Sequence, residues 1–177
     1  MATTLAFIAH CLEQRGWKYN FDADKCRIIT GVKAENVDDF GICIQLSENG
    51  EFLQFVAPQL LAVKDCLHKG VLFQTMLAIS WEVKMLRFEY DPTDGEVRAS
   101  IELPIEDSQL TERLFNRCLS GLIELVDSIA MPRLNAVLAT GVDPGPKSLA
   151  AHWLDGIPDE FLNLLGEAIA HRRQLDT

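Results

Sequence analysis

The sequence predicts an α+β domain in which helices pack on an antiparallel sheet. Segments of helical periodicity occur near the start, in the middle and after the last strands, and segments of alternating apolar residues lie between them. The links between successive strands are short, which favours antiparallel neighbours, and the predicted order lacks the parallel crossovers of a nucleotide-binding α/β fold. With 177 residues, 48% of them apolar, the chain can build a core without metal or disulfide support.

The first part of the chain is predicted to form a helix and a four-stranded meander. Residues 4–14 carry apolar side chains at three- and four-residue spacing, and Thr3 or Thr4 can cap this helix. Alternation then predicts four strands, near residues 17–21, 26–32, 40–46 and 52–56. Asn49-Gly50 supplies the positive-φ residues of the last turn, and we expect Pro58 to end the meander because proline lacks a ladder donor.

A helix is predicted over residues 63–84, and it is apolar on more than one side. Its main stripe has three- and four-residue spacing and consists of Phe73, Met76, Leu77, Ser80 and Trp81. Further apolar residues around it are Leu72, Ile79 and Val83. Because one face of a sheet covers one side of a helix, the rest must be covered by neighbouring helices or by a second subunit.

A hairpin and another helix follow. Strands near residues 86–90 and 97–105 flank the turn Asp91 to Gly95, in which proline presets φ and Gly95 takes the left-handed position. The next helix begins after a cap at Ser108 or Thr111. Its apolar stripe is Leu114, Cys118, Leu122, Leu125 and Ile129, and Pro132 should kink or end it.

The chain is expected to comprise a domain at residues 1–140 and a linker with a C-terminal helix at residues 141–177. Glycine and proline predict the linker, and the last helix starts at Pro158. The apolar stripe of this helix is Phe161, Leu162, Leu165 and Ile169. We expect the stripe to pack on protein, since it would otherwise remain in water.

Charge and hydropathy argue against nucleic acid and membrane as partners. The formal net charge of −10 repels nucleic-acid phosphates and anionic lipid headgroups. The most apolar stretch, residues 70–81, is interrupted by Gln74 and Thr75, so no membrane span is predicted. The N-terminus lacks the basic start of a signal peptide, and we expect a cytoplasmic protein.

No catalytic, cofactor or metal site is predicted, and we expect the protein not to be an enzyme. The five cysteines are widely spaced without a C-x-x-C pair, which is typical of reduced thiols. A zinc site or thiol nucleophile at Cys66 and His68 would need further ligands or a base from elsewhere. The carboxylates that could suggest calcium or acid–base chemistry lack the required spacing and suit turns or a solvated strand face. They are Asp22, Asp24, Asp91, Asp94, Glu96, Glu102, Glu106 and Asp107.

One region of the sequence resembles a known family. The region runs from Trp81 to Asp91 and continues through Asp94 to Val97 and Ile101 to Pro104. It resembles the YbjN family, a group of proposed bacterial sensory transduction regulators that shares its fold with the type III secretion chaperones. The resemblance covers about residues 1–137 and implies an acidic, cytosolic, often dimeric scaffold that binds protein. The extra strand near residues 17–21 and the segment after residue 141 depart from the family pattern.

Two functional hypotheses result. The first is a non-enzymatic protein-binding module, chaperone-like or regulatory, that holds an unidentified protein partner by a sheet edge and apolar grooves. The alternative is a small-ligand sensor or an enzyme built on Cys66, His68 or Cys118. We also expect a homodimer, in which a second subunit covers the excess apolar surface of the helix at residues 63–84. The candidate interface residues for a dimer or a partner are Phe73, Met76, Trp81 and Met85.

Overall fold

A computed structural model describes residues 3–106, 108–146, 158 and 160 of the chain. The chain divides into two compact units, Met1–Asp143 and Pro144–Thr177, and the fold described below is that of the first unit. The helix predicted from Pro158 onward, and its packing, lie outside the described residues apart from Pro158 and Glu160. The predicted domain boundary at residue 140 stays a prediction.

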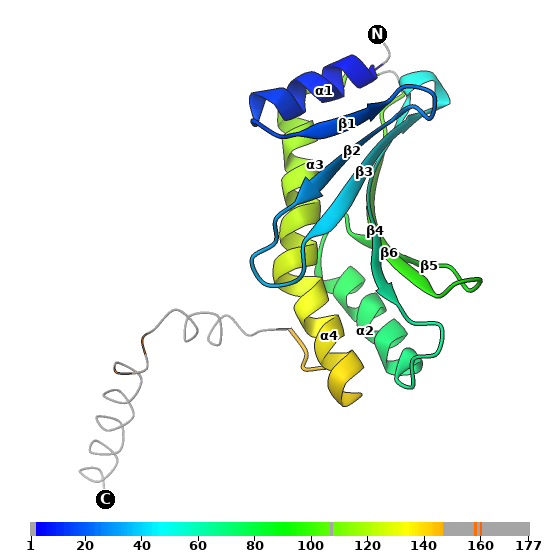
Figure 1. Cartoon of the computed structure of the whole chain (residues 1–177), viewed down its shortest axis with the longest axis vertical. Coiled ribbons are helices and arrows are strands. Elements are labelled where there is room, and N and C mark those ends of the chain that lie inside the picture. Colours follow the sequence, from blue (N-terminus) through cyan, green and yellow to red (C-terminus); the bar gives the residue numbers. More distant parts are fainter. Residues whose placement is uncertain (1–2, 107, 147–157, 159, 161–177) are drawn as a thin grey trace, which may run out of the picture. The chain divides into compact units, whose positions relative to one another are not determined.

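The first unit is an α+β domain, as the sequence predicts (Figure 1). Its helices are α1 (Leu5–Gln14), α2 (Lys69–Glu82), α3 (Glu112–Glu124) and α4 (Met131–Thr140), with a short 3₁₀ turn at Glu48–Gly50. Its strands are β1 (Tyr19–Asp22), β2 (Arg27–Val32), β3 (Phe40–Ser47), β4 (Phe52–Ala62), β5 (Arg87–Tyr90) and β6 (Glu96–Pro104). These six strands form one sheet in the order β1-β2-β3-β4-β6-β5, and all neighbours are antiparallel.

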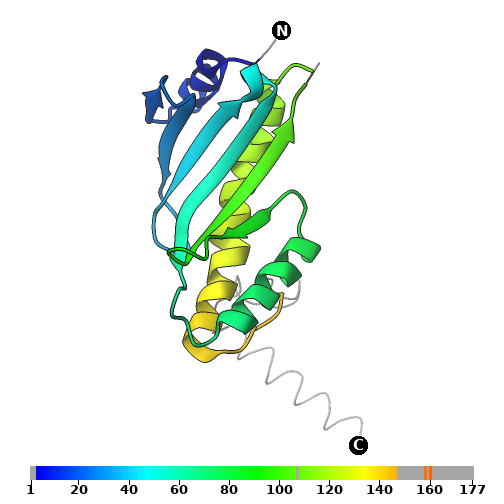
Figure 2. The same ribbon diagram turned by 90° about the vertical axis from the view of Figure 1, so that its right-hand side faces the viewer.

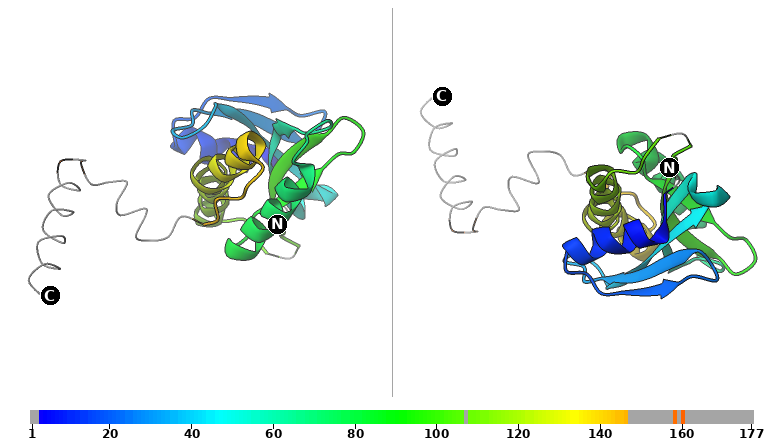
Figure 3. Two further views of the ribbon diagram at one scale, coloured as in Figure 1. Left: turned by 90° about the horizontal axis from the view of Figure 1, so that it is seen from below. Right: turned by 90° about the horizontal axis from the view of Figure 1, so that it is seen from above.

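Helices α1 and α3 cover one face of the sheet, and the core lies between them and the strands (Figure 2). Phe55 of β4 and Phe115 of α3 are fully buried there, with ring centroids 5.4 Å apart. Burial of a side chain of this size stabilises the fold by about 1.5–3 kcal/mol. Near one end of the sheet, α2 packs against α4 and β5 (Figure 3).

Threonine caps start two of the helices. The Thr4 hydroxyl accepts a hydrogen bond from the Phe7 N–H at 3.3 Å at the start of α1. The Thr111 hydroxyl accepts one from the Leu114 N–H at 3.1 Å at the start of α3. Each bond satisfies one of the N–H groups that have no partner inside the helix. Of the alternative caps that the sequence offers, these two are used.

The prediction that Pro58 ends the meander is wrong, since β4 continues to Ala62. Pairing of β4 with β3 stops at Val56, so no backbone hydrogen bond to β3 is lost because Pro58 lacks an N–H group. On the other side, the register between β4 and β6 shifts between Ala57 and Leu61, and the bulge carries Gln59 with a φ of 54°. A proline at a bulge costs no ladder bond, and the strand resumes beyond it.

The predicted start of α2 needs a correction. The helix begins at Lys69 because residues 63–68 form turns instead. Its buried side consists of Leu72, Thr75, Met76 and Ile79. The main stripe that periodicity indicates is therefore only partly covered, and its members Leu77 and Trp81 are 72% and 90% exposed. With apolar residues on several sides, periodicity alone does not identify the side that meets the core.

The helical path does not end at Pro132. Instead, α3 leads into a π-helical turn, Leu125–Ala130, and then into α4. The Met131 N–H donates to the Val126 carbonyl, a five-residue spacing, and Pro132 lies in the first turn of α4, where a missing N–H is tolerated. The buried side of α3 is Phe115, Cys118, Leu119 and Leu122, while Leu114 and Ile129 of the predicted stripe are exposed.

Candidate functional site

An apolar groove of about 460 Å³ lies between α2 and β5. It is lined by Phe73, Met76, Leu77, Ser80, Arg87, Phe88 and Tyr90. We call this groove, together with the neighbouring Trp81 and Met85, the α2 surface. A groove of this size and character accommodates several apolar side chains.

The α2 surface follows directly from the sequence of α2. The helix buries one side in the core, and its remaining apolar residues are left beside β5. At the groove, the rings of Phe73 and Tyr90 pack at a centroid distance of 4.8 Å with a tilt of 57°. The ammonium of Lys69 lies 5.7 Å from the centre of the Tyr90 ring and stabilises that ring by a cation–π contact. Contacts within the chain therefore hold the Phe73 and Tyr90 rings that form this wall of the groove.

The four interface candidates lie together but differ in exposure. Met76 is only 6% exposed and forms the base of the groove, whereas Phe73 is half-buried along its side. Trp81 is 90% exposed on the last turn of α2, and Met85 is 42% exposed in the link to β5. Met85 has a φ of 75°, a backbone conformation that costs energy for a non-glycine residue. Their roles in an interface stay a prediction.

The sequence did not identify Phe88, Tyr90 and Arg87 as members of this surface. Their strand, β5, was recognised, but its position beside α2 depends on pairing with β6 and on the packing of α2 against β5. Among the described strands, β5 pairs only with β6 and is therefore an edge of the sheet. Its outer backbone groups lie next to the groove, where an extended chain could add as a further strand.

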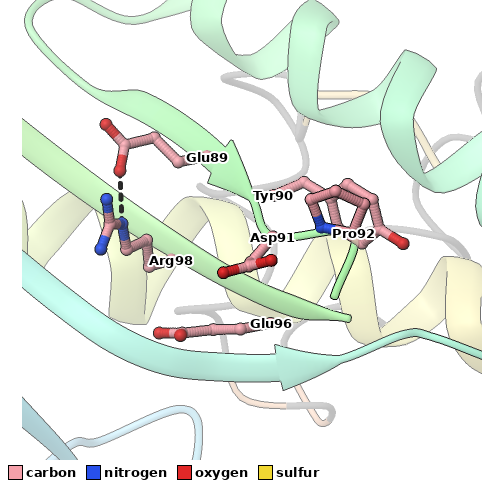
Figure 4. Close-up of a pocket in the computed structure, with 6 residues that line it drawn as sticks. All are labelled: Glu89, Tyr90, Asp91, Pro92, Glu96 and Arg98. Atoms are coloured by element: carbon pink, nitrogen blue, oxygen red, sulfur yellow. Dashed lines mark hydrogen bonds and ion pairs between the residues drawn. The ribbon is translucent and has the colours of Figure 1, made fainter. Parts of the chain in front are cut away.

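A second, smaller pocket of about 280 Å³ lies at the β5–β6 hairpin and is polar (Figure 4). Its lining residues are Glu89, Tyr90, Asp91, Pro92, Glu96 and Arg98. Glu89 is bonded to Arg98 and to Arg87. Burial alone would raise the pKa of Glu89, but the hydrogen bonds from these arginines outweigh burial and hold the pKa below its ordinary value.

The acidic turn residues mostly serve the backbone. Asp91 accepts hydrogen bonds from the N–H and hydroxyl of Thr93 at 2.8 and 2.6 Å. Asp94 accepts one from the Glu96 N–H at 2.9 Å, and the Glu96 carboxylate accepts one from the Gln59 N–H at 2.9 Å. The bonds of Asp91 and Asp94 are the turn chemistry expected from the sequence, whereas the bond from Gln59 to Glu96 joins the β4 bulge to the start of β6. Across residues 3–106 and 108–146, no group of three or more metal-ligating side chains is placed to hold a metal ion.

The sheet face opposite α1 and α3 carries a row of side chains across five strands. In register, Ile29 lies beside Cys43, Cys43 beside Val56, Val56 beside Ser100, and Ser100 beside Arg87. Ser100 is fully buried within this row, and its hydroxyl has no hydrogen-bond partner among the described atoms. Arg87 bonds to Glu102 at 2.5 Å, and Glu102 also accepts from Gln54 at 2.6 Å, so this face is largely occupied by its own polar network.

Two buried charged residues had no sequence signal. Arg133 of α4 is 6% exposed and donates to Glu82 at the end of α2 at 2.7 Å. It also donates twice to Asp143 after α4, at 2.6 and 2.8 Å. This triad fixes α4 to α2 and holds the chain that follows α4. Long-range ion pairs of this kind leave no periodic trace in a sequence.

The second buried charge is Asp127, in the π-helical turn. Its carboxylate accepts hydrogen bonds from the N–H groups of Glu35 and Asn36, at 3.1 and 2.9 Å, and from the Asn36 side chain at 3.2 Å. Burial would raise the pKa of Asp127, but these bonds outweigh burial, and the pKa lies below its usual value. The turn between β2 and β3 is thereby anchored to the helical layer.

The residues of the alternative hypothesis do not form a common site. Cys118 is buried in α3, where burial raises the pKa of its thiol and favours the neutral form. Cys66 and His68 are half-buried in the turns before α2. None of the five cysteines forms a disulfide. In the parts of the chain that the structure covers, no helix has the length and hydropathy needed to cross a membrane.

The comparison with known proteins gives a match of fold. No protein-family model matches the sequence, and no curated protein gives a significant match. The crystal structure of YbjN, a proposed transcription regulator from E. coli, matches with a TM-score of 0.60 at 14% identity. The match covers 77% of this chain and 94% of YbjN. The resemblance to YbjN that the sequence indicates is confirmed for the fold.

Two further structures are chains of protein complexes. One, from the HopA1–SchA chaperone–effector complex, has a TM-score of 0.48 at 16% identity and covers 68% of this chain and 88% of its own. The other, from the ExsC–ExsE complex, has a TM-score of 0.49 at 17% identity and covers 82% of this chain and 100% of its own.

Proposed function

We propose that this protein is a non-enzymatic protein-binding module, chaperone-like or regulatory, and that it forms a homodimer through the α2 surface. The observation that carries the proposal is the exposed apolar surface on α2, where Leu77 and Trp81 are 72% and 90% exposed beside an apolar groove. Contiguous apolar surfaces of this kind mark sites where proteins bind one another. The protein partner beyond the second copy is unidentified.

The chemistry of the surface fits protein better than other partners. A net charge of −10 disfavours nucleic acid and anionic membranes. Aromatic residues and methionine are enriched in protein interfaces, and Phe73, Trp81 and Met85 provide them here. The neighbouring edge strand β5 offers backbone hydrogen bonds to an extended segment, while the groove offers space for its side chains.

A substitution at Trp81 tests the homodimer. Because this side chain is 90% exposed, Trp81→Asp removes little from the fold of the monomer, but it places a charge in the proposed contact. Loss of an aromatic anchor costs about 2 kcal/mol or more, so we expect dimerisation to weaken at least ~30-fold. Light scattering over a range of concentrations measures this, with the wild type expected at twice the 19.8 kDa of one chain.

The matched control is Leu67→Asp. Leu67 is 89% exposed in the turns before α2 and does not line the groove, so it introduces the same charge outside the α2 surface. We expect this variant to remain dimeric. A wild-type mass near that of one chain at tens of micromolar protein would refute the homodimer, and equal weakening by both variants would refute the role of the α2 surface. Circular dichroism checks that each variant is folded.

A further inference from the structure

The free edge of β5 presents the backbone groups of Phe88 and Tyr90. Within the described part of the chain, β5 pairs only with β6, so its other edge carries no strand. At the hairpin end of this ladder, the Asp91 N–H donates to the Glu96 carbonyl at 2.9 Å. Backbone bonding alternates between the two sides of an antiparallel strand, so the N–H and C=O groups of Phe88 and Tyr90 point away from β6. A strand added at this edge would bond to these two residues.

The side chains of β5 define what such a strand must contain. Phe88 and Tyr90 line the apolar groove, whereas Arg87 and Glu89 project from the opposite face of the strand. Residues directly opposite each other on neighbouring strands share a face, and opposite charges stabilise such a pair. An antiparallel strand that fits β5 therefore reads apolar, basic, apolar, acidic. Its two apolar residues lie opposite Tyr90 and Phe88, and its two charged residues lie opposite Glu89 and Arg87.

The chain itself contains this pattern in β5. Residues 86–89 read Leu-Arg-Phe-Glu, which is apolar, basic, apolar and acidic in the required order. A second copy can thus add to the free edge of the first through the same strand, as a two-fold contact requires. Arg87 has capacity for a further partner, because both of its ion pairs within the chain use one nitrogen, Nη2.

The charges distinguish between the registers that two β5 strands can adopt. With Arg87 or Glu89 on the two-fold axis, that residue lies directly opposite its own copy, and like charges opposed in this way are destabilising. With Tyr90 on the axis, Glu89 lies opposite Asp91 of the partner subunit, which again opposes like charges. With Phe88 on the axis, Arg87 of each copy lies opposite Glu89 of the other. In this last register both charged pairs attract.

The same two-fold axis brings the α2 surfaces together. Phe88 and Tyr90 share the groove with α2, so an axis perpendicular to the joined sheet keeps both α2 helices on one face of it. A pair of four-residue strands is too small for a stable contact, because specific interfaces bury at least about 1,000 Å². The exposed side chains of Leu77 and Trp81 supply further apolar area on that face.

We propose that the second copy joins the first edge to edge at β5, with the two β5 strands antiparallel and Phe88 on the two-fold axis. Arg87 of each copy then pairs with Glu89 of the other, and the two six-stranded sheets form one continuous sheet. This inference rests on the proposed function, because it specifies how the α2 surfaces of two copies are held together.

The test reverses one charge at a time in the full chain and then mixes the variants. Arg87→Glu and Glu89→Arg each place like charges at both crossings of the dimer, and each should weaken self-association about tenfold. In a mixed dimer of these two variants, both crossings again join opposite charges, so its affinity should return to within about threefold of the wild type. Light scattering over a concentration series measures the affinities, and native mass spectrometry separates the mixed dimer from the two homodimers.

The matched control replaces Arg87→Glu by Arg98→Glu in the mixture. Arg98 also pairs with Glu89 within the chain, so this variant has the same change of charge and removes the same kind of ion pair, but it lies on β6 and not at the free edge. Its mixed dimer with Glu89→Arg keeps one crossing of like charges and should stay a minor species. Circular dichroism checks that every variant is folded.

The outcomes separate this inference from the proposed function. If the wild type is dimeric and Trp81→Asp weakens it, but neither reversal at β5 does, the inference is wrong while the homodimer through the α2 surface stands. The edge of β5 is then open to an extended segment of another protein. If both reversals weaken the dimer and mixing does not restore it, the charges act within the chain and the inference is also wrong. A wild-type mass near that of one chain would overturn both proposals.

Discussion

Replacement of Arg133 by methionine should destabilise the domain by about 2 kcal/mol. The guanidinium makes three hydrogen bonds of 2.6–2.8 Å to Glu82 and Asp143, and a hydrogen bond to a charged group contributes about 1.5–3 kcal/mol. Two effects reduce the net loss. The two carboxylates are 30% and 26% exposed, so water can solvate them in the variant. Methionine also avoids the desolvation cost of several kcal/mol that the buried guanidinium carries.

Urea denaturation followed by circular dichroism measures the change in the free energy of unfolding, and calorimetry measures the melting temperature. For a chain of this size, 2 kcal/mol corresponds to a decrease of roughly 4–8 °C. The control is Arg113→Met, which removes the same charge from an exposed position on α3 and should stay within about 0.5 kcal/mol of the wild type. If Arg133→Met lies within the same limit, the triad does not hold α4 to α2, and the reasoning is refuted.

Two further predictions concern a buried carboxylate and a glycine. Asp127→Asn should cost about 2 kcal/mol at neutral pH, since the carboxylate accepts three hydrogen bonds and an amide retains a single acceptor oxygen. Because the folded-state pKa of Asp127 is lowered, its contribution to the free energy of unfolding is complete above the unfolded pKa of about 3.9 and is lost as pH falls through the folded pKa. In urea titrations from pH 7 to about pH 3, the free energies of unfolding of the wild type and Asp127→Asn should therefore converge as pH falls. A difference that stays constant over this pH range would contradict the prediction. Gly95→Ala should lower the free energy of unfolding by roughly 3 kcal/mol in the same assay, because φ is +87° and the new Cβ would lie 2.3 Å from the Lys64 backbone nitrogen. An unchanged urea midpoint would show that the turn can move to accommodate the methyl group.

Local chemistry made much of the fold predictable. The threonine caps, the turn from Asp91 to Gly95 and the alternating strands depend on residues close together in the sequence, and the structure places them as expected. The predictions that are wrong concern features that depend on residues far away in the sequence. Pro58 is tolerated because β3 pairing has already stopped and β6 shifts register, neither of which is visible around residue 58.

The candidate surface was predictable in part for the same reason. The composition of α2 indicates that one layer cannot cover it, and Trp81 and Met85 are exposed in the structure. The choice of the buried side depends on where α4 and β5 lie. Their positions leave Met76 buried and Leu77 exposed, although both line the groove. The Arg133 triad and the Asp127 anchor join elements between 10 and 92 residues apart, which periodicity does not encode.

The position of β4 next to β6 has a consequence for synthesis on the ribosome. The strands β1 to β4 are consecutive in the chain and can pair while later residues are still being translated. The outer edge of β4 then stays unpaired until Pro104, at the end of β6, has left the exit tunnel. The apolar side chain of Phe55 stays uncovered until Phe115 of α3 has been synthesised. An unpaired strand edge in a nascent chain can recruit other chains. Slow translation between residues 62 and 104 should therefore lower the yield of folded protein, and a chaperone that shields strand edges should restore it.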